Sequence, residues 1–307
     1  MMWIRAASST ALAVLLAGCA TAPAQDAPSP APAPLTADSP APDTMRWLYG
    51  SGEAAGVSIQ AMRQLADYAV TQSRLRNIPQ SVPMGIEGTI RSESCIDGNR
   101  IKPLAVVFDV DETIVLNAGY EAWLAQGNTY SSESWQRWEE RGGPLARPVP
   151  GAVTALRRLR DAGITPVFNT NRQHSPEGAR QAIETAGLGQ AVHRETLFLR
   201  GDDGNEGSGK DGRRAAIASR YCVIALAGDN LGDFADLFNA PALSPQERRE
   251  LAARGEYAQL WGAGWFALPN PAYGDSLKGT IRKVFGRDAD WSPQPGDAPP
   301  IANEGSK

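Results

Sequence analysis

The sequence predicts an α/β fold: a parallel, Rossmann-like sheet with a small helical cap. Two observations support this prediction. Short apolar runs of strand length recur along the chain with helix-like stretches between them, and each run ends in polar residues suited to chemistry. Because open parallel sheets bind their ligands at the carboxyl ends of the strands, we expect the active site at that edge.

The first strand is predicted at residues 104–108, a fully apolar run rich in Val, as in strands buried on both faces. Asp109 and Asp111 follow it directly. Side chains two apart on a strand point the same way, so both carboxylates can emerge together. Two adjacent carboxylates repel each other, so the pair indicates either a bound cation or a division of labour between an acid and a base.

Two further apolar runs, residues 163–168 and 221–227, are predicted as strands, and a helix is expected between them from residue 210. The residues after the second strand offer a hydroxyl and free backbone N–H groups, which together can bind an anionic oxygen. The third leads into two more aspartates. In chain order, the polar residues of these segments are Thr170, Asn171, Lys210, Asp229 and Asp233.

This order of motifs resembles the haloacid dehalogenase superfamily of phosphotransferases, and the paired aspartates resemble its four-aspartate branch. The chain is similar in particular to the class C nonspecific acid phosphatases, bacterial lipoprotein enzymes that also act as 5′-nucleotidases. The likeness runs from Trp47 to Phe285, and only residues 83–102 stay unassigned. The segments that carry the likeness are Ser51–Glu53, Val110–Thr113 with Asn117, Thr170–Arg172, Gly228–Leu231 and Leu268–Asp275.

The resemblance implies a sheet of the haloacid dehalogenase type and a Mg²⁺-dependent acid phosphatase. Its substrates would be phosphomonoesters such as nucleoside 5′-monophosphates and aryl phosphates. Asp109 would attack phosphorus to give an aspartyl-phosphate, and Asp111 would act as acid and then as base. The residues expected to hold Mg²⁺ are Asp109, Asp111 through its backbone carbonyl, Asp229 and Asp233; those expected to hold phosphate are Thr170, Asn171 and Lys210.

Residues 117–150 are predicted to form the cap over the active site, because this segment is too short for a domain and too aromatic for a plain loop. Trp135 and Trp138 are three apart, so on a helix they share a face. The resemblance places such aromatics around the leaving group, with core packing as the alternative for each one. The residues expected to stack on the leaving group are Tyr120, Trp135, Trp138 and Tyr273.

Residues 1–18 have the pattern of a lipoprotein signal peptide. A positive charge precedes an apolar stretch too short to span a bilayer, and small residues precede Cys19. Cleavage would leave Cys19 to carry lipid, and two or more acyl chains anchor a protein stably. An Asp after the lipidated cysteine would favour retention in the inner membrane, but this position is Ala20. In a two-membrane bacterium we therefore expect the protein to be anchored to the outer membrane, where it faces the periplasm or the surface. An ordinary secretory signal with an incidental cysteine is the alternative.

The mature chain divides into three predicted parts. Residues 19–45 form a lipid-anchored, Pro/Ala-rich tether, since residues 21–45 hold seven of the 23 prolines. Residues 46–290 form the acid phosphatase domain, which is long enough for one substantial core. Residues 291–307 form a flexible tail.

Composition limits the partners. The formal net charge is −4 and no basic stretch suggests a nucleic-acid polymer. Arg213 and Arg214 are therefore expected on a solvated helix face. Small phosphomonoesters and the membrane, through the N-terminal lipid, are the expected partners, and a homodimer stays open. Export makes a disulfide between Cys95 and Cys222 possible, and two unrelated buried thiols are the equal alternative.

Three other functions remain open from the sequence. The chain could be a periplasmic phosphatase of narrow specificity, or a phosphotransferase that passes the phosphoryl group to an alcohol. It could also be a surface lipoprotein that only binds a ligand such as haem or a nucleotide. Loss of a catalytic aspartate would favour the binding protein, and none is lost.

Overall fold

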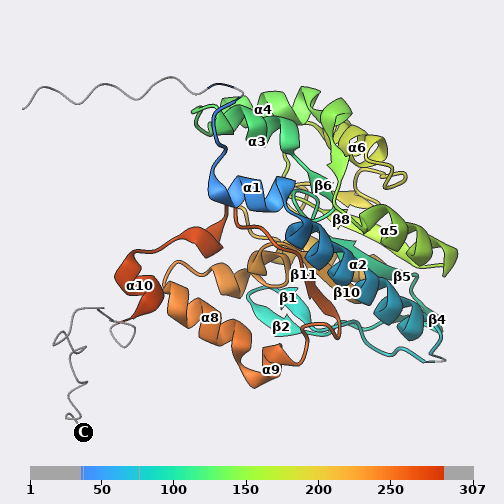
Figure 1. Ribbon diagram of the computed structural model, residues 1–307. Helices are drawn as coiled ribbons and strands as arrows, with labels where there is room; N and C mark the ends of the chain where they lie inside the picture. The colour runs from blue at the N-terminus through green and yellow to red at the C-terminus, as the bar shows by residue number, and fades with distance from the viewer. Residues whose placement is uncertain (1–35, 37, 76, 287–307) are drawn as a thin grey trace, which may run out of the picture. The chain divides into compact units, whose positions relative to one another are not determined.

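A parallel sheet of five strands forms the centre of the computed structural model, which describes residues 36, 38–75 and 77–286 (Figure 1). The order β11-β10-β5-β8-β9 puts the first strand of the sheet in its middle, and the predicted α/β fold class is confirmed. The strands are β5 (Leu104–Phe108), β8 (Thr165–Asn169), β9 (Leu197–Phe198), β10 (Cys222–Gly228) and β11 (Trp265–Ala267). The predicted signal peptide, Cys19 and the tail after residue 290 lie outside the described residues.

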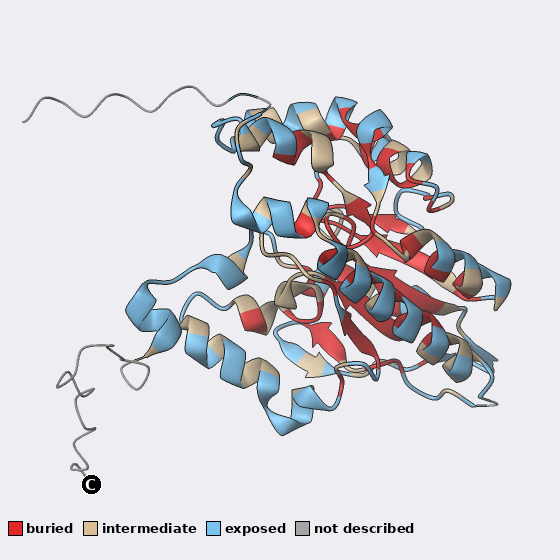
Figure 2. Cartoon of the chain, in the orientation of Figure 1, coloured by how far each residue is buried: buried red, intermediate tan, exposed pale blue. Residues whose placement is uncertain are grey.

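The sheet is buried on both faces, as Figure 2 shows, because successive side chains of a strand point to opposite sides. Val106 and Phe108 of β5 join a core with α2, α5 and α6, whereas Ala105 and Val107 join a second core with α7. The helices that cover the faces are α2 (Gly52–Ser73), α5 (Ala152–Asp161), α6 (Pro176–Thr185) and α7 (Asp211–Arg220). This double burial explains why the strand sequences are continuously apolar.

The cap leaves the core between two short strands that pair antiparallel and so form its stem. Gly178 lets α6 approach the cap closely, because a Cβ there would lie 1.8 Å from the Glu139 carbonyl oxygen. Figure 1 shows α3 and α4 together, in green, above α1. The stem is β6 (Val115–Leu116) and β7 (Arg147–Pro148), and the cap comprises α3 (Ala118–Ala125), α4 (Ser132–Arg141) and the 3₁₀ turn η1 (Gly143–Leu145).

Two hairpins occupy the segment that the sequence left unassigned. They are β1 (Met84–Ile86) with β2 (Thr89–Arg91), and β3 (Ile96–Asp97) with β4 (Arg100–Ile101). The first packs beside the sheet in the same core as α7.

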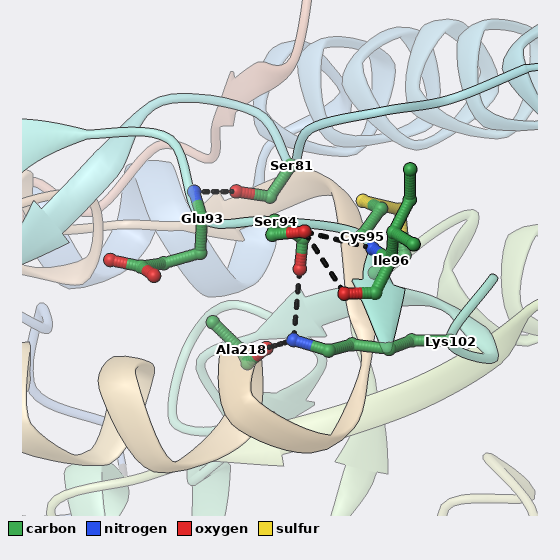
Figure 3. The surroundings of a disulfide bond; sticks show 8 residues. Ser81, Glu93, Ser94, Cys95, Ile96, Lys102 and Ala218 are labelled. Carbon is green, nitrogen blue, oxygen red and sulfur yellow. Dashed lines mark hydrogen bonds between the residues drawn. A yellow bond between two sulfur atoms is a disulfide. The ribbon is translucent and has the colours of Figure 1, made fainter. Parts of the chain in front are cut away.

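A disulfide joins Cys95 to Cys222, which decides between the two possibilities that the sequence left open. The Cα atoms are 4.5 Å apart, and the bond ties the second hairpin to the first residue of β10. Close by, the Lys102 ammonium donates to the carbonyls of Ser94 and Ala218 at 2.8 and 2.9 Å (Figure 3). The hairpin is therefore fixed to both β10 and α7.

The prediction that Arg213 and Arg214 lie on a solvated helix face is wrong, because both are buried. Arg214 donates from Nε to the Gly85 carbonyl at 2.8 Å and pairs with Asp236 at 3.0 Å. Arg213 donates to Asn171 Oδ1 at 2.6 Å. A buried charge is tolerated when carboxylates and carbonyls surround it, so these two arginines fasten α7 to both the hairpin and the site.

The remaining elements flank the sheet. Among the described residues, no helix is both long and apolar enough to cross a bilayer. These elements are α1 (Asp43–Gly50), η2 (Leu231–Asp233), η3 (Asp236–Asn239), α8 (Pro245–Ala253), α9 (Gly255–Ala258), η4 (Asp275–Leu277) and α10 (Ile281–Phe285).

Candidate active site

Three aspartates meet where the two central strands end. β5 and β10 run parallel with Phe108 opposite Ala227, so the residues that follow them are neighbours. Oxygen atoms of Asp109, Asp229 and Asp233 all lie within 4.8 Å of one another. The structure thus brings together three of the four residues expected around a cation.

Gly228 explains how Asp233 reaches this cluster. A Cβ at position 228 would lie 2.3 Å from the Cβ of Asp233, so only glycine lets the following 3₁₀ turn fold back onto the strand end. Asp233 also accepts a bond from the Asn230 N–H at 2.9 Å, which closes the turn. The local sequence therefore builds the geometry that presents the third carboxylate.

Lys210 supplies the positive charge that faces these carboxylates. Its ammonium pairs with Asp109 Oδ1, and with Asp233 Oδ1 at 2.7 Å. Burial alone would lower the pKa of Lys210, but attraction to Asp109 and Asp233 outweighs burial and raises it. The Lys210 N–H is held at 2.7 Å by Asp236, so the start of α7 is fixed.

The cluster fits a hard divalent cation. Thr113 and Asn270 donate to the two oxygens of Asp229 at 2.7 and 2.8 Å. Even so, burial and then the charge of Asp233 raise the pKa of Asp229 to about 7. The three carboxylates are therefore short of positive charge, and carboxylate oxygens are the ligands that Mg²⁺ prefers.

Asp111 lies in a different environment, although it follows the same strand. Arg172 pairs with Asp111 Oδ1 at 2.7 Å, and the Asn117 amide donates to the same oxygen at 2.9 Å. Burial alone would raise the pKa of Asp111, but attraction to Arg172 and its hydrogen bonds outweigh burial and lower it. The side chain of Asp111 is thus held apart from the cluster of three aspartates, and the two carboxylates after β5 have separate partners.

The residues expected to hold phosphate divide into two groups. Lys210 and Asn171 line the cavity beside Asp109. Thr170 is fully buried, and its hydroxyl lies 3.3 Å from Asp111 Oδ2 and accepts the Arg172 N–H at 3.1 Å. Thr170 therefore contacts Asp111 and is not among the residues that line the cavity.

A cavity of about 890 Å³ opens above the carboxylates. Of the aromatics expected around a leaving group, Tyr120, Trp135 and Tyr273 line this cavity, and Tyr130 lines it as well. Trp138 does not. The lining of the cavity therefore combines aromatic side chains with the charged groups.

Trp138 instead supports the cap from within. Its ring lies 6.1 Å from that of Tyr120, and its Nε1 donates to Asn117 Oδ1 at 2.7 Å. The same oxygen accepts from Arg172 at 2.9 Å. Trp138 is therefore connected to Asp111 through hydrogen bonds, which is the packing role left open for each cap aromatic.

Glu112 is a site residue to which the sequence analysis gave no role. Its backbone is left-handed with φ of 57°, an unusual conformation for a residue other than glycine. Its buried carboxylate accepts from Tyr49 at 3.0 Å, from the Asn117 N–H at 2.7 Å and from the Tyr273 hydroxyl. Burial, and then the charge of Asp111, raise the pKa of Glu112 to about 7. Glu112 thus joins α1, the entry to the cap and the C-terminal segment.

Glu139 fixes the cap to the loop that carries Arg172. This buried carboxylate of α4 accepts the N–H groups of Gln173 and His174 at 3.1 and 2.7 Å. The Arg172 guanidinium also lies 5.7 Å from the centre of the Trp135 ring. The cap and the loop that carries Arg172 therefore hold each other in place.

Comparison with known proteins agrees with this geometry. Residues 56–276 match the family described as HAD superfamily, subfamily IIIB (acid phosphatase). A class C acid phosphatase from Bacillus anthracis with tungstate bound has a TM-score of 0.60 and 19% identity, over 81% of this chain and 95% of that chain. A second structure of the class C acid phosphatase from Bacillus anthracis has a TM-score of 0.57 and 21% identity, over 76% and 84% of the two chains.

The match covers well over half of the sequence and includes all four strand-end aspartates, while the two solved structures share the fold. The chain therefore belongs to the acid phosphatases of subfamily IIIB of the haloacid dehalogenase superfamily, which are phosphomonoester hydrolases.

Proposed function

We propose that this chain is a Mg²⁺-dependent acid phosphatase that hydrolyses nucleoside 5′-monophosphates and aryl phosphates. The observation that carries the proposal is the meeting of Asp109, Asp229 and Asp233 with Lys210 at one end of an aromatic-walled cavity. Phosphoryl transfer needs a positioned nucleophile and fixed positive charge around the transferred group, and these residues supply both.

Asp109 is the proposed nucleophile. It lies at the end of β5, its N–H is held at 2.9 Å by the Ala227 carbonyl, and Lys210 contacts its Oδ1. Its carboxylate oxygen attacks phosphorus, the bond from phosphorus to the leaving oxygen breaks, and an aspartyl-phosphate results. Water then attacks this phosphorus and releases phosphate.

Asp109, Asp229 and Asp233, with the backbone carbonyl of Asp111, are the groups proposed to hold the cation. When bound there, Mg²⁺ would supply positive charge that screens the nucleophile from the phosphate and offsets the charge of the transition state. Lys210 shares this function, since it already pairs with two of the three carboxylates.

Asp111 is the proposed acid and base. It protonates the leaving oxygen and then takes a proton from the attacking water. Arg172 and Asn117 hold its carboxylate in one orientation, at 2.7 and 2.9 Å. The attraction to Arg172 lowers the pKa of Asp111, so its protonated form needs an acidic medium, which agrees with an acid phosphatase.

The phosphate oxygens are proposed to contact Lys210 and Asn171, which line the cavity. Asn171 is oriented by Arg213, which donates to its side-chain oxygen at 2.6 Å. Thr170 contributes by positioning Asp111 and the Arg172 N–H.

Flat leaving groups are proposed to lie among Tyr120, Trp135 and Tyr273. Aromatic stacking distinguishes poorly between one ring and another, so nucleotides and aryl phosphates should both be accepted.

The first test removes the nucleophile. Asp109→Asn preserves the size of the side chain but not its nucleophilicity, so phosphate release should fall by at least about 1,000-fold. Phosphate release from p-nitrophenyl phosphate and AMP measures this, with Asp97→Asn, an exposed hairpin aspartate, as the matched control. Retention of more than a few per cent of activity by folded Asp109→Asn would refute the assignment.

The second test concerns stacking. Tyr273→Ala should lower kcat/KM for nucleoside monophosphates by about 5- to 150-fold, since stacking on an aromatic side chain contributes about 1–3 kcal/mol per base. Ethyl phosphate, which cannot stack, should lose much less. Tyr273→Phe is the control, because it removes only the hydroxyl that donates to Glu112. Equal losses on both substrates would mean that Tyr273 supports the fold.

We also propose that Cys19, which precedes the described residues, carries lipid and anchors the enzyme to the outer membrane. In a two-membrane bacterium, Cys19→Ser should give an unprocessed precursor or a soluble form, whereas Ala20→Asp should move the processed protein to the inner membrane. Fractionation and intact mass measure both. A processed Cys19→Ser protein in the outer membrane would contradict the anchor.

A further inference from the structure

Glu121, on cap helix α3, is a buried carboxylate without a partner. The residue is only 5% exposed, yet it lines the large cavity. Among the described residues, the other buried carboxylates each accept a hydrogen bond or pair with a cation, whereas nothing donates to the carboxylate of Glu121. The partnered ones are Asp109, Glu112, Glu139 and Asp211.

Burial alone acts on this group. It raises the pKa of Glu121 to about 7, and no neighbouring donor or positive charge offsets the effect. The carboxylate oxygens of Glu121 are not among the fully buried unsatisfied atoms, so they are open to the cavity that the residue lines, and none of the described residues donates to them there. A partner that arrives with a ligand would supply that donor.

The surroundings of Glu121 indicate the chemistry of the ligand. Leu124, one turn further along α3, and Met45 of α1 line the same cavity, as do the aromatic side chains. A carboxylate accepts hydrogen bonds and attracts positive charge, so its partner must donate or be cationic. Aromatic walls favour either a flat ring or an ammonium group.

We propose that Glu121 strengthens the binding of those phosphomonoesters whose leaving group carries an N–H donor. This inference rests on the proposed phosphatase function, because the phosphate would lie at Asp109 and Lys210 while the rest of the substrate extends toward the cap. Two sources share the chemistry: the exocyclic amine of a nucleobase, and a protonated alkyl amine.

The test measures binding, so that it does not depend on turnover. In an Asp109→Asn background with Mg²⁺, calorimetry compares AMP with purine riboside 5′-monophosphate, which lacks the amine, and phosphoethanolamine with ethyl phosphate. The titrations are run about one pH unit above the pKa of Glu121, which is about 7, so that its carboxylate is ionised. Adding Glu121→Leu should weaken at least one amine-bearing ligand by about 10- to 100-fold, the worth of a hydrogen bond to a charged group. The affinity of the matched ligand without the amine should change by less than about 3-fold.

Matched controls separate this role from a structural one. Glu140→Leu alters an exposed glutamate of α4 outside the cavity and should leave all four affinities unchanged. Because Glu121 has no partner to lose, Glu121→Leu should melt at or above the temperature of the parent protein. If only AMP loses affinity, the group that Glu121 contacts is the exocyclic amine of the base. If only phosphoethanolamine loses affinity, that group is the ammonium.

Two results would overturn the assignment. One is that, in the Asp109→Asn protein, the amine-bearing ligand of each pair binds no more tightly than its amine-free match. The other is that the affinities do not change after Glu121→Leu. A marked drop in melting temperature would also overturn it, because the carboxylate would then have a structural partner. Phosphate release from p-nitrophenyl phosphate by the unmodified enzyme tests the phosphatase function separately, so failure of one does not imply failure of the other.

Discussion

The crowding of three carboxylates against one ammonium is the interaction on which the rest of the site depends. Asp109, Asp229 and Asp233 repel each other, and among the described residues only Lys210 pairs directly with any of them. Lys210 can do so because Asp236 holds the start of α7. Arg214 in turn links α7 to the β1–β2 hairpin, so an element at the side of the sheet supports the chemistry at its end.

The two aspartates after β5 have identical side chains but different environments. Asp109 faces the carboxylate cluster, whereas Asp111 faces Arg172 and Asn117. Glu112, the next residue, has a left-handed backbone, and the partners of its carboxylate come from three segments of the chain. The cap contributes through Glu139, which holds the N–H groups of Gln173 and His174 beside Arg172, so Asp111 is oriented by core and cap together.

The sequence predicted the strand-end aspartates because apolar runs of strand length mark where a buried strand stops. It could not predict that Arg213 and Arg214 are buried, since two adjacent arginines on a helix normally lie in water. The partners of Glu112 were equally hidden, because Tyr49 and Tyr273 lie 63 and 161 residues away. Glu121 gave no signal at all, since only the folded cap shows that it lacks a partner.

Direct measurement of metal binding tests the central claim. Titration of Mg²⁺ into the metal-free protein by calorimetry should give one site per chain, and Asp229→Asn should weaken that site by at least about 10-fold, because a ligand oxygen with its charge is lost. Asp97→Asn, far from the cluster, should leave it unchanged. Absence of Mg²⁺ binding, or equal affinity in Asp229→Asn, would contradict the account.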